Sequence, residues 1–121
     1  MKGRRGTAIV ENKKGILLTA MSKGGVFLLP GGQADRGEPR FRAAIRELQE
    51  ETSLLANSAE IIFKHESRHN KHTVVLIKAR GTPKPKREVK VIEYYNHNKK
   101  IKMSQGTKDI IKKYLLWKSK I

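Results

Sequence analysis

The chain has 121 residues, of which 27 are lysine or arginine and 11 are aspartate or glutamate, so its formal net charge is +16 and its pI is near 10.4. The absence of cysteine excludes disulfides, thiolate metal sites and thiol catalysis. No apolar run reaches the length of a membrane span and the amino terminus does not resemble a signal peptide, so we expect a cytoplasmic protein without a membrane partner. The length suits one domain, residues 1–121.

The amino-terminal third of the chain is rich in strand-forming residues. Apolar and β-branched runs predict strands at residues 6–11, 15–21 and 26–29. A polar turn at residues 12–14 and a glycine-containing break at residues 22–25 separate these runs. After a loop at Pro30, Gly31 and Gly32, Pro39 suits the first turn of a helix, because its missing N–H is not needed there.

The second half of the chain predicts further strands and a terminal helix. Residues 60–64 and 73–79 are predicted strands, joined by a polar connection at residues 65–72. Two prolines and a glycine make residues 81–86 a loop, which a strand at residues 88–95 follows. The last helix begins at Ser104 or Thr107. This order predicts an α/β fold in which a mixed sheet lies between helices.

The helix that follows Pro39 has two distinct faces. Its apolar residues recur at helical spacing, at Phe41, Ala44, Ile45 and Leu48. Glu47, Glu50 and Glu51 are three and four residues apart and share another face, where like charges repel one another. A solvated face balanced by neighbouring arginines is one explanation. The alternative is that the three carboxylates bind a hard divalent cation such as Mg²⁺, which takes oxygen ligands.

Residues upstream of these glutamates extend the pattern. The chain follows the spacing G-x5-E-x7-R-E-U-x-E-E-x-G-U, where U is aliphatic, at Gly32, Glu38, Arg46, Glu47, Leu48, Glu50, Glu51 and Leu54. This is the motif of the Nudix hydrolases, and the chain therefore resembles these MutT-like enzymes, which cleave diphosphate linkages with a divalent metal. Ser53 departs from the motif, since it stands where the family has glycine. A residue with a Cβ enters the backbone conformation of that glycine at a cost of about 1 kcal/mol or more, so the helix is expected to end differently.

The resemblance implies a fold, a cofactor and a set of site residues. The implied fold is the Nudix α/β/α sandwich with a mixed sheet, a loop–helix–loop catalytic motif and a C-terminal helix. The implied cofactor is Mg²⁺, with Mn²⁺ as a substitute. The implied metal ligands are Glu47, Glu50 and Glu51, assisted by Glu38 and the carbonyl of Gly32, while Arg46 orients the carboxylates by ion pairing.

Many Nudix enzymes use one more acid outside the motif. Glu88 is the first candidate, because it follows the proline-rich loop and precedes Tyr94 and Tyr95 by a family-like interval. Glu93 and Glu66 are alternatives. The implied catalytic residues are therefore Glu47, Glu50, Glu51, Arg46 and Glu88.

Histidines and aromatic residues form weaker candidate sites. His65, His69 and His72 have helical spacing, but their surroundings predict a strand connection, so a solvated loop or a phosphate contact is favoured over zinc binding. Tyr114 and Trp117 lie on an amphipathic helix, where packing is favoured over stacking on a base.

The substrate is predicted from family markers and charge. The chain lacks the downstream proline that accompanies ADP-ribose hydrolysis, the tyrosine typical of diadenosine polyphosphate hydrolysis and the coenzyme A signature. A nucleoside triphosphate, including an oxidised or noncanonical one, is therefore the leading substrate. An RNA 5′-pyrophosphohydrolase is the alternative that the positive charge favours, and a catalytically silent module that binds polyanions is the third. The expected partner is a small nucleotide or an RNA 5′ end, and the oligomeric state is left open.

Overall fold

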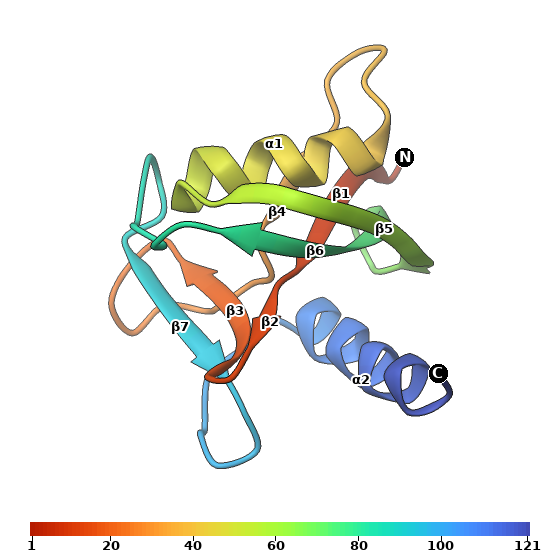
Figure 1. Cartoon of the computed structure of the whole chain (residues 1–121). Helices are drawn as coiled ribbons and strands as arrows, with labels where there is room; N and C mark the ends of the chain where they lie inside the picture. Colours follow the sequence, from red (N-terminus) through yellow and green to blue (C-terminus); the bar gives the residue numbers. More distant parts are fainter.

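The computed structural model describes all 121 residues. In chain order the elements are β1 (Gly3–Ile9), β2 (Glu11–Asn12), β3 (Gly15–Ala20), β4 (Gly31–Gln33), α1 (Arg40–Thr52), β5 (Leu55–Glu66), β6 (Asn70–Arg80), β7 (Val91–Tyr95) and α2 (Gln105–Ser119). Figure 1 shows α1 and α2 on opposite sides of the strands. Neither helix is both long and apolar enough to span a membrane.

The principal sheet is mixed, as predicted. It has four strands in the order β4-β1-β6-β5, and a second sheet has three strands in the order β2-β3-β7. Strand β1 pairs in parallel with β6 and antiparallel with β4, whereas β5 and β6 form an antiparallel hairpin. Parallel neighbours need a long crossover connection, and α1 lies within the segment that joins β1 to β6.

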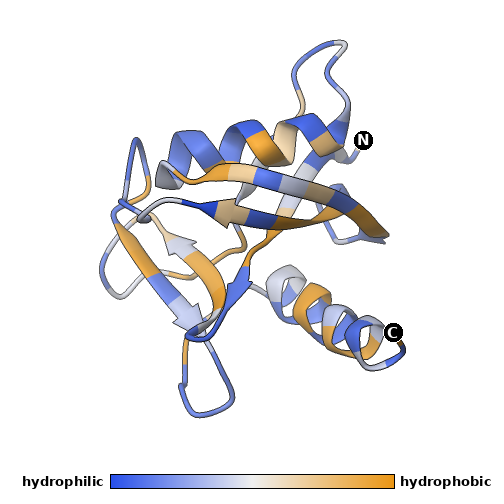
Figure 2. Ribbon diagram, viewed as in Figure 1, coloured by the Kyte–Doolittle hydropathy of each residue, from blue (hydrophilic) through white to orange (hydrophobic).

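The core has two halves, one on each side of the principal sheet. Successive residues of a strand point to opposite faces, so Ala8 packs with α1 whereas its neighbour Ile9 packs with α2. Figure 2 shows the matching apolar stripes on both helices. The half under α1 contains Ala8, Val10, Leu17, Ala44, Leu48, Leu54, Val75 and Ile77, and the half under α2 contains Ile9, Ile16, Leu18, Leu29, Val74, Ile110, Ile111 and Tyr114.

Gly6 allows α1 to lie directly on β1. A Cβ at this position would stand 2.1 Å from the carbonyl oxygen of Arg40 and 2.5 Å from the amide nitrogen of Ala44. Both of these are backbone atoms of the helix, so a larger residue could be accommodated only by moving α1 off the sheet. This close approach holds the acidic face of α1 against β4.

The predicted strand at residues 26–29 is wrong. Phe27 and Leu28 form only isolated bridges, to Met103 and Thr19 respectively, and the regular strand β4 begins instead at Gly31. Pro30 contributes to the difference, since it has no N–H to donate to a ladder. The bridges still attach this segment to β3 and to the residues that precede α2.

Strand β5 is longer than predicted. It runs over Leu55–Glu66. The sequence pattern underestimated its length because register shifts between Ala56 and Ser58 and between Ile61 and Phe63 interrupt the side-chain alternation that identifies a strand. The polar connection is correspondingly shorter, and His65 and His72 lie opposite each other on β5 and β6.

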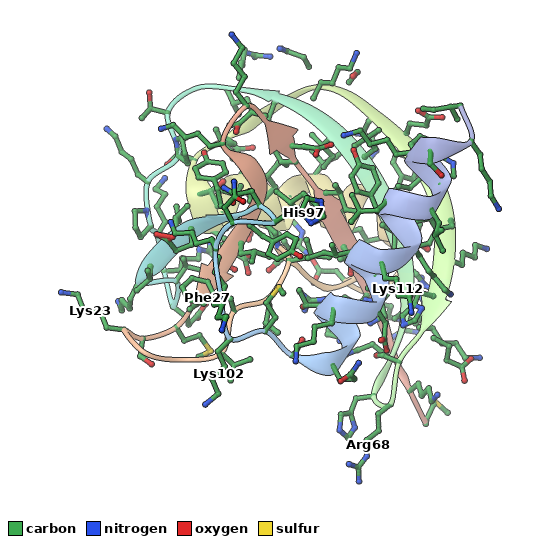
Figure 3. The ribbon with its side chains drawn as sticks, turned by 90° about the horizontal axis from the view of Figure 1, so that it is seen from below. Lys23, Phe27, Arg68, His97, Lys102 and Lys112 are labelled. Carbon is green, nitrogen blue, oxygen red and sulfur yellow. The ribbon has the colours of Figure 1, made fainter.

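The positive charge is spread over the surface. Figure 3 shows Lys23, Arg68 and Lys102 projecting outward from different segments, with Lys112 on α2. The acidic residues are less evenly distributed, since five of the 11 fall between Asp35 and Glu51. The same segment also contains four arginines, Arg36, Arg40, Arg42 and Arg46, so its acidic side chains lie among cations.

Helix α1 ends in the left-handed conformation that the family glycine would adopt. Ser53 has φ 70° and ψ −1°, and its N–H donates to the carbonyl of Gln49. The expectation of a different helix end is therefore wrong. The flanking residues Thr52 and Leu54 are both buried, and their anchoring holds the backbone of Ser53 in this conformation.

We expect Ser53→Gly to raise the free energy of unfolding by no more than about 1 kcal/mol and to leave activity unchanged. Glycine relieves the left-handed strain, but part of that gain is offset by the greater entropy of the unfolded chain. Urea denaturation of the wild type, Ser53→Gly and Ser53→Ala measures this, with Ser53→Ala expected to match the wild type. A loss of stability in Ser53→Gly would contradict the assignment.

Candidate active site

Arg46 is the centre of the acidic face of α1. Its Nε and Nη2 each donate to a different oxygen of Glu38, both at 2.9 Å. Its Nη1 donates to Glu47 at 2.6 Å and approaches both oxygens of Glu50, the nearer at 3.2 Å. A single guanidinium thus neutralises part of the charge of three carboxylates. The catalytic role of Arg46 that the family resemblance implies stays a prediction.

Glu38 connects the loop before α1 to the helix. The hydrogen bonds from Arg46 hold the pKa of this carboxyl at about 2, and the backbone N–H of Asp35 contributes a further one at 2.9 Å. Arg46 also donates to the carbonyl of Gln33 at the end of β4. Glu38 therefore stays ionised and joins the loop, β4 and α1 into one unit.

The carboxylate of Glu51 is directed toward β4 and makes no ion pair with Arg46. Its Oε1 accepts a hydrogen bond from the N–H of Gly31 at 3.1 Å. Burial is the largest influence on this carboxyl and raises its pKa to about 7, with a further increase from the charges of Glu47 and Glu88. The bond from Gly31 and the charge of Arg5 oppose this rise only in part. Glu51 is therefore a partly desolvated carboxylate with little compensating positive charge.

Gly32 lies in direct contact with Glu47. A Cβ on this glycine would stand 2.4 Å from Oε2 of Glu47, so no larger residue fits without moving that carboxylate. The backbone of β4 consequently contacts the acidic face at two adjacent glycines. The role of the Gly32 carbonyl as a metal ligand remains a prediction.

Arg5 is a site residue that the sequence did not reveal. It lies on β1, and its Nη2 donates to the carbonyl of Leu29 at 3.0 Å. Burial lowers the pKa of its guanidinium, and the charges of Glu51 and Glu47 oppose that effect. The signal that could have identified it is its position two residues before the buried Thr7, on the same face of the strand.

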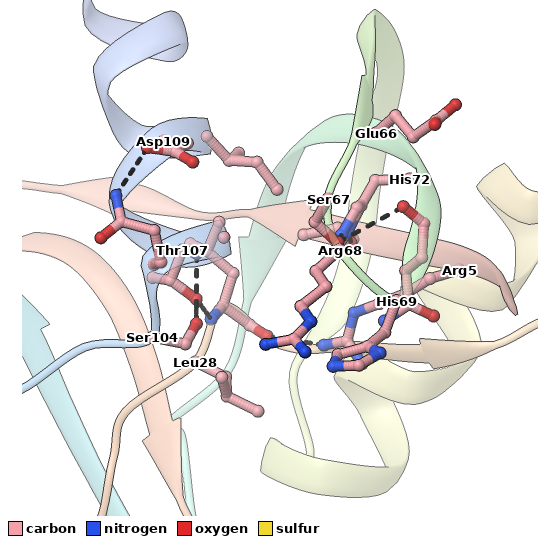
Figure 4. A pocket seen from close by; sticks show the side chains of 16 residues that line it. Arg5, Leu28, Glu66, Ser67, Arg68, His69, His72, Ser104, Thr107 and Asp109 are labelled. Carbon is pink, nitrogen blue, oxygen red and sulfur yellow. Dashed lines mark hydrogen bonds between the residues drawn. The ribbon is translucent and has the colours of Figure 1, made fainter. Parts of the chain in front are cut away.

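A cavity of about 680 Å³ adjoins Arg5. It opens between the β5–β6 turn and the beginning of α2, and Figure 4 shows Arg68 and His69 on the first of these walls and Ser104 and Thr107 on the second. Three of its 16 lining residues are hydrophobic. The complete lining consists of Arg5, Thr7, Leu28, Leu29, Glu66, Ser67, Arg68, His69, Asn70, His72, Ser104, Gln105, Gly106, Thr107, Asp109 and Ile110.

The three histidines have separate positions. His72 is buried, and its ring nitrogens lie 2.7 Å from the hydroxyl of Thr7 and 2.9 Å from that of Ser67. Burial lowers its pKa to about 4, with smaller contributions from Arg5 and His65, so His72 is neutral at physiological pH. His69 lines the cavity, whereas His65 packs beside the ring of His72.

Of the candidate acids outside the motif, Glu88 is the one whose charge acts on a glutamate of α1. Its charge raises the pKa of Glu51, whereas Glu93 pairs with Lys99 and Glu66 pairs with Lys2. The loop that carries Glu88 is attached to the end of α1, because the N–H groups of Lys84 and Lys86 donate to the carbonyls of Thr52 and Glu51.

Arg87 belongs to the same loop. Its Nη1 lies 3.3 Å from Oε2 of Glu50, although 63% of its side chain is exposed. Its φ is 54°, in the left-handed region. Such a backbone costs about 1 kcal/mol, and an ion pair this exposed contributes about 0–1 kcal/mol. The pair therefore adds little or nothing to net stability.

The donor set of the site suits a hard divalent cation. Four glutamates, Glu38, Glu47, Glu50 and Glu51, supply carboxylate oxygens beside the backbone of Gly31 and Gly32. No three acidic or histidine side chains converge on one point, because Arg46 lies among three of these carboxylates. Metal binding would thus draw oxygens away from Arg46.

The family comparison agrees with this geometry. The family model described as the NUDIX domain matches residues 1–114. The chain belongs to the Nudix family. The protein is therefore a Nudix pyrophosphohydrolase. Enzymes of this family generally use divalent metals.

Individual relatives support the family assignment. An ADP-ribose pyrophosphatase from Methanocaldococcus jannaschii is 30% identical over an alignment that covers 92% of this chain and 72% of the relative. The solved structure of a nudix hydrolase family member from Chromobacterium violaceum is 38% identical, with a TM-score of 0.87 over 95% of this chain and 77% of that one. An ADP-ribose pyrophosphatase from Streptococcus suis has a TM-score of 0.79 over 99% of this chain and 92% of that one. Its identity of 16% shows a shared fold only.

We expect Glu51→Gln to stabilise the metal-free protein at about pH 8 by about 1–3 kcal/mol. The folded-state pKa of Glu51 lies above its ordinary value of 4.5. Deprotonation as the pH rises from 4.5 through about 7 therefore costs stability in the wild type, and glutamine removes that cost.

Urea denaturation in chelator measures the difference between the two proteins. The difference should vanish below about pH 4.5, where both side chains are neutral. Glu60→Gln, an exposed residue of β5, is the control and should show no such pH dependence. Equal stability of Glu51→Gln and the wild type at pH 8 would contradict the desolvated state of Glu51.

Proposed function

We propose that the protein hydrolyses a diphosphate linkage in a nucleoside polyphosphate with Mg²⁺, and that a nucleoside triphosphate or a noncanonical nucleotide is its substrate. One observation carries the proposal, namely that Glu47, Glu50 and Glu51 share one face of α1 against the glycine backbone of β4. Carboxylates that repel one another in this way are useful where a cation binds between them and substrate phosphates.

The residues of the site have two roles, since some bind the metal ions and others orient the metal-binding carboxylates. Glu47, Glu50 and Glu51, with the carbonyl of Gly32, would hold Mg²⁺ or Mn²⁺, and Glu38 acts mainly through Arg46. The bound ions supply charge neutralisation of the phosphates and a more acidic water. The intact set of glutamates argues against a silent polyanion-binding module.

Hydrolysis also needs an acceptor for a proton. The attacking water loses a proton as its oxygen bonds to phosphorus and the bridging P–O bond breaks. We propose that Glu88 accepts this proton, because its charge raises the pKa of Glu51. The carboxylate of Glu88 is also available, since it makes no ion pair and no side-chain hydrogen bond. Its attachment through the loop to the end of α1 keeps it near the glutamates.

The cavity beside Arg5 is the proposed place for the nucleoside part of the substrate. Arg5 connects the two regions, since it lines the cavity and is influenced by the charges of Glu51 and Glu47. A volume of about 680 Å³ lies in the range typical of small-molecule sites. ADP-ribose is a second candidate, which the relative from Methanocaldococcus jannaschii favours and the missing downstream proline disfavours.

Hydrolysis should require Mg²⁺ or Mn²⁺, and Glu51→Gln should lower the rate by orders of magnitude while the fold persists. The substitution keeps the size of the side chain and removes its negative charge. Release of phosphate or pyrophosphate from a panel of nucleoside triphosphates, ADP-ribose and triphosphorylated RNA measures this. Glu60→Gln is the control and should behave as the wild type. Turnover in excess chelator, or a fully active Glu51→Gln enzyme, would refute the proposal.

Salt dependence should separate a nucleotide substrate from RNA. An RNA chain that contacts several surface cations would lose affinity by about one power of salt concentration per phosphate contact. A single nucleotide held in the site should show a much shallower slope, and we expect the shallow slope because the cations are spread over the surface. A steep slope, with RNA turned over far more efficiently than any free nucleotide, would favour the RNA enzyme.

A further inference from the structure

We propose that Arg87 binds the phosphate groups of the substrate and that its ion pair with Glu50 is the resting position of this side chain. The inference rests on the proposed function, because it concerns the same glutamates. Lys84, Lys86 and Arg87 look alike in the sequence as cations of a polar loop, but only Arg87 contacts a carboxylate of the site.

The position of Arg87 is fixed from both sides of the loop. Before it, the N–H groups of Lys84 and Lys86 donate to carbonyls of α1 at 2.9 and 3.0 Å. After it, Val89 is buried, and its N–H donates back to Lys86. Hydrogen bonds therefore anchor the backbone on both sides of Arg87, and its long side chain extends from there to Glu50.

The backbone of Arg87 indicates a role other than stability. Apart from Ser53, it is the only residue other than glycine with a positive φ. The exposed ion pair with Glu50 does no more than offset this strain, as argued above. Strained positions that packing does not explain occur preferentially at functional sites.

The charges around Glu50 indicate what that role is. Arg46 is engaged with Glu38, Glu47 and Glu50 together, and the half-buried Arg5 donates to the carbonyl of Leu29, so contacts within the protein already hold both guanidinium groups. Arg87 has one carboxylate partner and a side chain that is 63% exposed. A cation that takes over the carboxylate of Glu50 would leave the guanidinium of Arg87 without a partner, beside the place where a polyphosphate brings negative charge. A planar guanidinium matches phosphate oxygens in pairs, which a lysine cannot do.

Two binding measurements test the proposal independently of turnover. Affinity for a nucleoside triphosphate with non-hydrolysable methylene bridges is measured by calorimetry in Mg²⁺, and Mn²⁺ affinity without nucleotide is measured by electron paramagnetic resonance. We expect Arg87→Ala to weaken the analogue about tenfold and to leave Mn²⁺ affinity equal or higher, since a competing cation has been removed. KM should rise by a similar factor in an active enzyme. Arg87→Lys should recover part of the loss, and Lys86→Ala is the matched control from the same loop.

Two results would overturn the proposal. Weaker Mn²⁺ binding in Arg87→Ala with unchanged analogue affinity would mean that Arg87 only positions Glu50. Recovery of wild-type analogue affinity in Arg87→Gly, which relieves the backbone but has no guanidinium, would mean that only the strain matters. Failure of the proposed hydrolysis is a separate outcome, because the loss of analogue affinity in Arg87→Ala still supports the role of Arg87 when no substrate is turned over.

Discussion

The guanidinium of Arg46 is the interaction on which the acidic site depends. Glutamates at three- and four-residue spacing repel one another, and the carboxyl end of a helix disfavours further negative charge. Arg46 reduces this repulsion by pairing with Glu38, Glu47 and Glu50 at once. Because one of these partners lies in the preceding loop, the same pairing also closes that loop onto α1. Charge balance and loop conformation are therefore one property of the site.

Glu51 shows what the site costs the fold. Its carboxylate is desolvated between α1 and β4, and the bond from Gly31 compensates for only part of that loss. A protein that tolerates such a group needs stability from elsewhere, and here it comes from the two halves of the core on opposite faces of the sheet. Destabilised groups of this kind are expected where activity demands them.

The basic surface and the acidic site have complementary roles. Five of the 11 acidic residues lie between Asp35 and Glu51, and the carboxylates of Glu47, Glu50 and Glu51 would repel a polyphosphate in the absence of a bound cation. A net charge of +16 spread over the rest of the surface raises the local concentration of polyanions. Short-range attraction then has to come from bound cations and from an arginine beside the glutamates that can turn toward a ligand, which explains why the placement of Arg87 matters more than the total charge.

The sequence by itself determined the fold class, the two-faced helix α1 and the identity of the acidic cluster. These features depend on residues a few positions apart, whose spacing directly sets which side chains share a face. Only the tertiary structure decided that Ser53 adopts the left-handed conformation, that the charges of Glu51 and Glu47 act on Arg5 and that Arg87 reaches Glu50. The flanking burial of Ser53 is created by the packed fold, and each arginine meets carboxylates that are distant in the chain. Such groups come together only when the chain folds, so the spacing of neighbouring residues in the sequence cannot predict their contacts.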